Sequence, residues 1–212
     1  MQEQLRTSDF PIFWQYLAHL ISFVFHPIFV TVYIIGFLIW ANPYMFSEAP
    51  LILSLVTLNA VFFPLITILM MRQLDFLQSF TLENRQERIF ALIPTMVFLI
   101  WTFTVFWRST HPKIIANVLF GVCLALALVF VVNAVYEKIS LHTTAMGGWF
   151  AVALFAPNIA VYDLTLNIIG VLLIAGLVGT CRLLVKAHTT REVYYGYVLG
   201  FMTMAMGLIW LR

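Results

Sequence analysis

The sequence predicts an all-α protein, a polytopic bundle of six to seven transmembrane helices. Only 9% of its residues are charged and 63% are hydrophobic, whereas a soluble domain carries about 25% charged residues. The mean hydropathy of +0.99 indicates the same apolar environment. Apolar runs also recur at close to the roughly 20 residues that a helix needs to cross a bilayer. A formal charge of +2 is too small to indicate nucleic acid as a partner, so we expect the lipid bilayer.

The N-terminal segment is expected to differ from the rest of the chain. Residues 1–18 are predicted to lie at the membrane surface, and residues 19–212 to form the transmembrane helical domain that carries the site. Trp14, Gln15 and Tyr16 mix aromatic with polar side chains, as is typical of the membrane interface. The first residues include two acids and lack the basic region of a cleavable signal peptide, so we expect the first span to be retained.

Seven apolar stretches follow, separated by turn residues or polar links. Pro43 and Pro50 mark the first link, and a longer polar segment, residues 72–88, forms the second. Pro157 interrupts the fifth stretch near its end. The predicted spans are residues 19–40, 51–71, 89–107, 114–136, 143–161, 164–185 and 193–211.

The polar side chains suited to chemistry fall in alternate links. If all seven stretches cross, the links after the second, fourth and sixth spans lie on the same side as the N-terminus. Ionisable groups near a bilayer are costly and tend to be kept for function, so we expect one site at this face. The residues are Arg85 and Arg88 in the first of these links, Lys138, Ser140 and His142 in the next, and Arg182, Lys186, His188, Arg191 and Glu192 in the last.

The last link pairs a histidine with a carboxylate. His188 precedes Glu192 by four residues, which places both on one helical face, where the carboxylate can fix the imidazole tautomer. A nucleophilic or proton-transferring histidine needs this support. The planar guanidinium of Arg182 suits phosphate. The alternative is a basic juxtamembrane stretch that binds lipid head groups.

The other two links could complete an anion site. Ser140 directly precedes a predicted span and can cap that helix, whose free amides would attract an anion beside His142 as a general acid. Arg85 and Arg88 are neighbours on a helix and could clamp a phosphate. The alternatives are a capping serine with an interfacial histidine, and a positive loop with local Glu–Arg pairs.

Two of these patterns resemble those of a known family. Arg182-x5-His188-x3-Glu192 resembles the third motif of the type 2 phosphatidic acid phosphatase superfamily, S-R-x5-H-x3-D, and Ser140-Leu-His142 resembles the end of its second motif, P-S-G-H. The stretch from Lys138 to His142 also resembles the K-I-S-x-H motif of a compact bacterial branch. The resemblance covers about residues 80 to 200. The family's first motif, K-x6-R-P, is absent.

The resemblance implies a metal-independent phosphatase of the bacterial inner membrane that needs no cofactor. Its substrate would be a lipid phosphate: a polyprenyl diphosphate, phosphatidate or phosphatidylglycerophosphate. His188 would attack phosphorus and form a phosphohistidine, Glu192 would orient it, and His142 would protonate the leaving group. The residues implied to hold the phosphoryl oxygens are Arg182, Lys138, Ser140 and Arg85 or Arg88.

Two other functions are compatible with the residues. His26, His142, His188 and Glu192 are ligand types that zinc prefers, which would give a membrane metal hydrolase, although the basic residues of the last link would repel a cation. A lipid-phosphate binding or transport protein on the same fold is the non-enzymatic alternative. It is favoured by the departures from the family pattern, such as glutamate in place of the family's aspartate.

Overall fold

The computed structural model describes residues 11–74, 85–136 and 138–210, without the side chains of residues 85–88 and 210. Within these residues the chain forms helices and no strand, which confirms the all-α prediction. The helices are α1 (Ile12–Val24), α2 (Pro27–Ala41), α3 (Ala49–Thr57), α4 (Phe63–Gln73), α5 (Arg85–Arg108), α6 (Lys113–Val135), α7 (Leu141–Phe155), α8 (Thr165–Leu184) and α9 (Thr190–Trp210).

Four to five of the described helical stretches are long and apolar enough to cross a membrane. Four of these stretches are long and apolar enough by themselves. The bent pair of α1 and α2 is the fifth when the two helices are taken together as one span. The six to seven predicted spans are therefore matched only in part. With 15 residues, α7 is shorter than the roughly 20 residues of an ordinary span. The single stretches are Ala49–Gln73, Ile89–Arg108, Lys113–Val135 and Thr165–Leu184.

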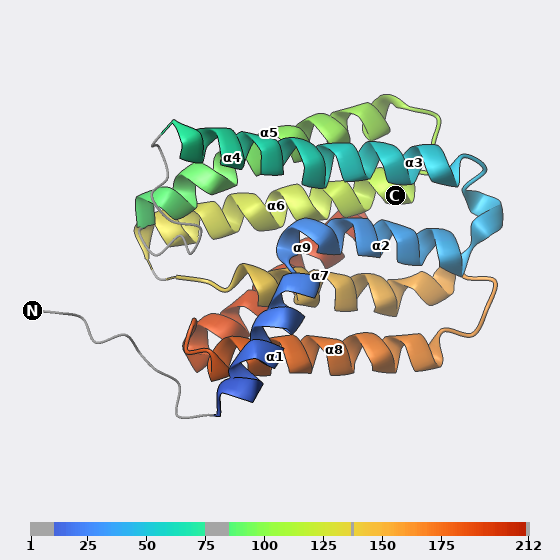
Figure 1. Cartoon of the computed structure of the whole chain (residues 1–212). Coiled ribbons are helices and arrows are strands. Elements are labelled where there is room, and N and C mark those ends of the chain that lie inside the picture. Colours follow the sequence, from blue (N-terminus) through green and yellow to red (C-terminus); the bar gives the residue numbers. More distant parts are fainter. Residues whose placement is uncertain (1–10, 75–84, 137, 211–212) are drawn as a thin grey trace, which may run out of the picture.

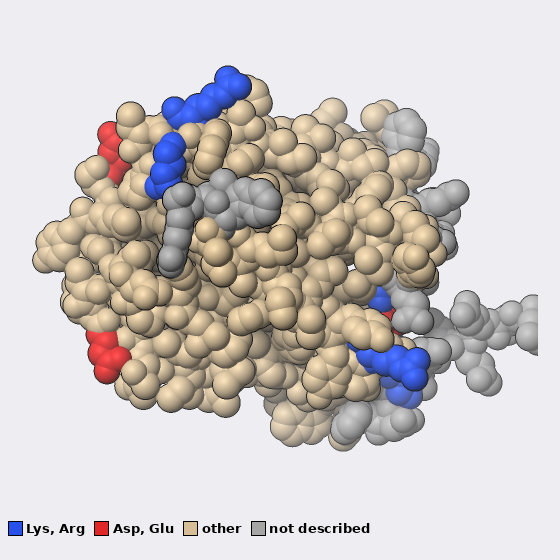
Figure 2. Space-filling model, turned by 180° about the vertical axis from the view of Figure 1, so that it is seen from behind, with Lys and Arg blue, Asp and Glu red and all other residues tan. Residues whose placement is uncertain are grey.

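The distribution of charge fits a membrane protein as well. Figure 2 shows lysine, arginine, aspartate and glutamate near the two ends of the visible face, with a broad uncharged band between them. Large apolar side chains such as Trp101, Leu173 and Val198 are exposed along the helices. Lipid can cover such side chains, whereas water cannot do so without cost.

The first predicted span is broken. One helix, α1, runs through the predicted boundary at residue 18 and ends at Val24, and α2 starts at Pro27 after a bend of 57°. Proline has no amide hydrogen and restricts the residue before it, so His26 leaves the helical region and caps α2. The break therefore falls at Phe25 and His26 rather than at the end of the polar segment.

The closest helix contact is between α7 and α9. A side-chain carbon at Gly200 would overlap the carbonyl oxygen of Thr144, and one at Gly196 would overlap the hydroxyl of Thr143. Two glycines four residues apart let helix backbones approach closely, as is common in membrane bundles. This contact holds the first turns of α7 beside the first turns of α9.

The links alternate between the two ends of the bundle. Figure 1 shows the links from α6 to α7 and from α8 to α9 at the end where α4 finishes and α5 begins, at the left of the view. The links from α2 to α3, α5 to α6 and α7 to α8 lie at the opposite end.

Candidate functional site

A tight turn at the end of α8 positions His188. The amide of Lys186 donates to the carbonyl of Leu183 at 3.0 Å, and the amide of Ala187 donates to that of Arg182 at 3.2 Å. These two bonds define a Schellman turn, in which the residue after the helix adopts a left-handed conformation. Lys186 occupies that position with φ 51°. The turn reverses the chain, so His188 follows directly and α9 begins at Thr190.

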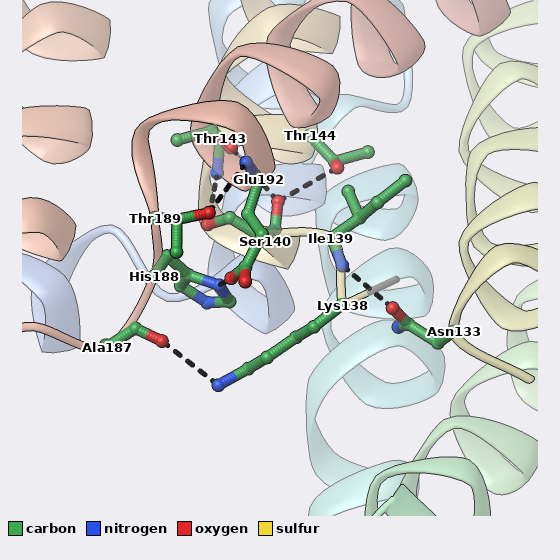
Figure 3. Close-up of polar contacts among 10 residues, drawn as sticks. All are labelled: Asn133, Lys138, Ile139, Ser140, Thr143, Thr144, Ala187, His188, Thr189 and Glu192. Atoms are coloured by element: carbon green, nitrogen blue, oxygen red, sulfur yellow. Dashed lines mark hydrogen bonds and ion pairs between the residues drawn. The ribbon is translucent and has the colours of Figure 1, made fainter. Parts of the chain in front are cut away.

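The start of α9 supplies the partner of His188. The amide of Glu192 donates to the hydroxyl of Thr189 at 3.4 Å, so Thr189 caps the helix. The Thr-x-x-Glu spacing is that of a capping box, in which the glutamate usually turns back to the cap residue. Here its Oε2 instead lies 2.6 Å from Nδ1 of His188 (Figure 3). The predicted contact of His188 with Glu192 is confirmed, but His188 lies in the turn before α9 and not on the same helical face as Glu192.

Two hydrogen bonds join this link to the link between α6 and α7 (Figure 3). The ammonium of Lys138 donates to the carbonyl of Ala187 at 3.0 Å, and the amide of Ser140 donates to the carbonyl of Glu192 at 3.4 Å. The predicted convergence of these two links at one end of the protein is therefore confirmed, although about 50 residues separate them.

Ser140 is fully buried and caps α7, as predicted. Its hydroxyl accepts from the amide of Thr143 at 3.5 Å, and its carbonyl accepts from the hydroxyls of Thr143 and Thr144 at 3.1 and 2.9 Å. These bonds fix the direction in which α7 leaves the link. Ser140 therefore orders the backbone of the first turn of α7, which adjoins the site.

His142 and His26 lie together beside the break between α1 and α2. Nε2 of His142 is 3.1 Å from the carbonyl oxygen of Ser22, and because a carbonyl only accepts, this nitrogen carries a proton. The ring of His26 stands edge-on to that of His142, with the ring centroids 5.2 Å apart. Nδ1 of His26 accepts from the amide of Ile28, so its Nε2 carries the proton of the neutral ring. Ser22 was not predicted from the sequence, because no local pattern connects residues 120 positions apart.

Arg182 is a half-buried cation within electrostatic range of three of the five histidines: His26, His142 and His188. Its Nε is buried and has no hydrogen-bond partner. Among the residues that the structure describes, Glu192 pairs with His188, and no carboxylate forms an ion pair with Arg182. A partly buried charge without a counter-charge is costly, so this arrangement favours a bound anion.

The environment of His188 favours its neutral form. Burial lowers the pKa of the imidazole below its usual range, and the cations of Lys138 and Arg182 act in the same direction, while the Glu192 hydrogen bond opposes them. With Nδ1 held by Glu192, Nε2 of the neutral ring is left as the nucleophilic nitrogen.

An open pocket of about 570 Å³ adjoins this pair. It is lined by Lys138, Thr189, Thr190, Arg191 and Glu192. Ligand pockets typically measure about 300–1,000 Å³, so a phosphorylated head group fits.

Two predicted arginines and the two other histidines of the chain are not part of the described site. The side chains of Arg85 and Arg88 lie outside the part of the chain that the structure describes. His111 lies at the opposite end of the bundle, with its Nδ1 3.7 Å from a carboxylate oxygen of Glu48. His19 is exposed on α1.

The zinc hypothesis depends on ligands that converge on one point. Zinc takes four ligands at about 2 Å from the metal. In the described ranges, no three of the His, Cys, Asp and Glu side chains are gathered in a way that could hold a metal ion.

Comparisons with protein-family models, curated proteins and solved structures found no match.

Proposed function

We propose that this chain is an integral-membrane enzyme that hydrolyses a phosphomonoester or diphosphate of a lipid through a phosphohistidine. The reaction class is the one implied by the resemblance to type 2 phosphatidic acid phosphatases. The observation that carries the proposal is the 2.6 Å contact between His188 and Glu192, close to Arg182, with which no carboxylate of the described residues forms an ion pair.

The first step is attack on phosphorus by Nε2 of His188. The P–O bond to the leaving group breaks as the N–P bond forms, and Glu192 stabilises the ring as it becomes positively charged. Arg182 and Lys138 balance the charge on the phosphoryl oxygens, so charge stabilisation comes from the chain itself.

His142 donates the proton that the leaving oxygen takes up. Its Nε2 proton is bonded to the Ser22 carbonyl, so Nδ1 is the nitrogen that takes up a second proton when the anionic substrate binds beside it, and that proton passes to the leaving group. In the second step water attacks the phosphohistidine, the N–P bond breaks, and inorganic phosphate leaves. The neutral His142 accepts the proton of that water, which restores both histidines.

We infer that α7 and α9 cross the membrane together with the other spans, in a bacterial inner membrane. Both pack against the helices that are long enough to cross, and α9 is about 32 Å long at 1.5 Å per residue. This gives the six to seven spans expected from the sequence and places a single polar site at one membrane surface.

Phosphate release by the purified protein in detergent tests the proposal. The panel contains polyprenyl diphosphate, phosphatidate and phosphatidylglycerophosphate, and the variants are His188→Ala and the matched control His19→Ala. We expect release that vanishes in His188→Ala, persists in His19→Ala and in EDTA, and is inhibited by vanadate. Release that EDTA abolishes and zinc restores would favour the metal hydrolase. The binding or transport alternative predicts no release by any variant.

A further inference from the structure

Three buried polar atoms without hydrogen-bond partners lie on the segments around His142. They are Oγ of Ser22, Nε1 of Trp149 and Nε of Arg182. Ser22 is only 5% exposed, and its carbonyl contacts His142. Trp149 follows His142 by two helical turns on α7 and packs against Phe25, next to His26. A buried polar group without a partner costs about 1–3 kcal/mol, so a ligand that accepts hydrogen bonds from these donors would be stabilised here.

The chemistry of these groups selects an anion. The guanidinium and the indole nitrogen can only donate, the Ser22 hydroxyl can donate, and the neutral His26 ring carries its proton on Nε2. Arg182 adds a positive charge, and Glu192, the carboxylate of the nearby site, is occupied by His188. Because donors and a cation prevail, these groups suit a ligand with anionic oxygens.

The donors at the break between α1 and α2 lie outside the pocket beside His188, and Arg182 and His142 link the two places. The pocket beside His188 is lined by residues of the α6–α7 and α8–α9 links, whereas Ser22 and His26 come from the break between α1 and α2. Arg182 and His142 lie between the two groups, since each interacts electrostatically with both His26 and His188. The site therefore offers two neighbouring positions for anionic groups.

We propose that Ser22, His26 and Arg182 form a second phosphate subsite, which makes a lipid diphosphate the substrate class. This inference rests on the proposed function: the terminal phosphate lies at His188 and the inner phosphate at His26. His26 is exposed, which gives the lipid access to the subsite.

The reaction balances without another reactant besides water. The lone pair on Nε2 of His188 forms the N–P bond to the terminal phosphorus, and the electrons of the broken P–O bond move to the bridging oxygen of a lipid monophosphate. A phosphate group has a second pKa of about 6, so it leaves more easily than an alcohol does. Water then releases inorganic phosphate from His188.

Binding of non-hydrolysable analogues tests the subsite directly. We would titrate an alkyl phosphonate and an alkyl bisphosphonate of equal chain length into purified protein by calorimetry. The variants are His26→Ala, Ser22→Ala and the matched control His19→Ala, which lies on α1 as Ser22 does. We expect wild type and His19→Ala to prefer the bisphosphonate, and His26→Ala to bind it about tenfold more weakly, as for one lost charge-assisted hydrogen bond, with little change for the phosphonate.

The subsite is overturned if wild type binds both analogues equally, or if His26→Ala weakens both equally. Should His26→Ala unfold, His26→Asn retains a capping side chain for α2, and Ser22→Ala removes only an unpartnered hydroxyl; both must lower the bisphosphonate preference.

Phosphate release from a matched polyprenyl monophosphate and diphosphate separates the two proposals. Release without a diphosphate preference leaves the phosphatase and removes the subsite. A His26-dependent preference in binding without any release keeps the subsite and removes the phosphatase.

Discussion

At the scale of single residues, the carboxylate of Glu192 governs the state of His188. Its Oε2 lies 2.6 Å from Nδ1, so it fixes the tautomer and stabilises the charge that appears when Nε2 attacks. We predict that Glu192→Gln lowers kcat roughly 10- to 150-fold, which corresponds to the about 1.5–3 kcal/mol of a hydrogen bond to a charged group. Glu192→Asp keeps the negative charge, so its kcat should fall less than that of Glu192→Gln. Equal losses in both variants would show that the charge is not what matters.

The pH dependence of activity follows from the same pair. His188 acts as a nucleophile only when neutral, and its pKa lies below its usual value of about 6.5. A lowered pKa means that the neutral ring persists as the pH falls, so kcat/KM should show no acid limb near 6.5 and decline only at lower pH. The facing groups are Lys138, Arg182, His142 and Glu192. Glu192→Gln removes the group that raises this pKa, so the limb should move further to acid; a shift towards neutral pH would contradict the assignment.

At the scale of elements, the turn after α8 is conformationally strained at Lys186. A left-handed conformation costs an ordinary residue roughly 1–2 kcal/mol, and glycine avoids this cost. We predict that Lys186→Gly leaves the melting temperature unchanged or higher, whereas the β-branched Lys186→Val destabilises by about 1–2 kcal/mol. Thermal unfolding of both variants checks this, and a more stable Lys186→Val would contradict it.

The crossing of α7 and α9 depends on glycine in the same way. A methyl group at Gly200 would overlap the Thr144 carbonyl, so Gly200→Ala should push α7 away from α9 and lower both the melting temperature and phosphate release. Gly176 on α8 has no atom within 4 Å of a Cβ built on it, which makes Gly176→Ala the matched control. That change should be neutral or stabilising by up to about 1 kcal/mol, as alanine is the better helix former. A tolerated Gly200→Ala would refute the close packing.

How well each element could be predicted depended on the range of the interactions that determine it. The helix α6, Lys113–Val135, matches the expected span 114–136 closely, because its boundaries follow from apolar length alone. The four-residue spacing of His188 and Glu192 predicted their pairing, although His188 lies in the turn before α9 and the contact crosses the helix cap rather than following one helical face. The contact of His142 with Ser22 depends on how α1 packs in the bundle, and no local pattern encodes it. The left-handed Lys186 was equally hidden, since glycine is the usual signal for that turn.

At the scale of the whole molecule, the alternation of the links makes the membrane topology testable. Tyr136 and Thr190 are exposed beside the proposed site, and Tyr44 and Tyr162 are exposed in links at the opposite end. In a background with Cys123 and Cys181 replaced by alanine, single cysteines at these four positions can be labelled with a membrane-impermeant maleimide, in intact and in permeabilised cells.

We expect the four positions to label as two pairs. If α7 crosses the membrane, Tyr136→Cys and Thr190→Cys react from one side, and Tyr44→Cys and Tyr162→Cys react from the other. If α7 does not cross, Tyr162→Cys reacts from the side of Tyr136→Cys, because only α7 and its short extension separate the two positions, and Thr190→Cys reacts from the side of Tyr44→Cys, because α8 still crosses. The same experiment therefore decides between four or five spans and the larger number, and it identifies the membrane surface from which a lipid phosphate would reach His188.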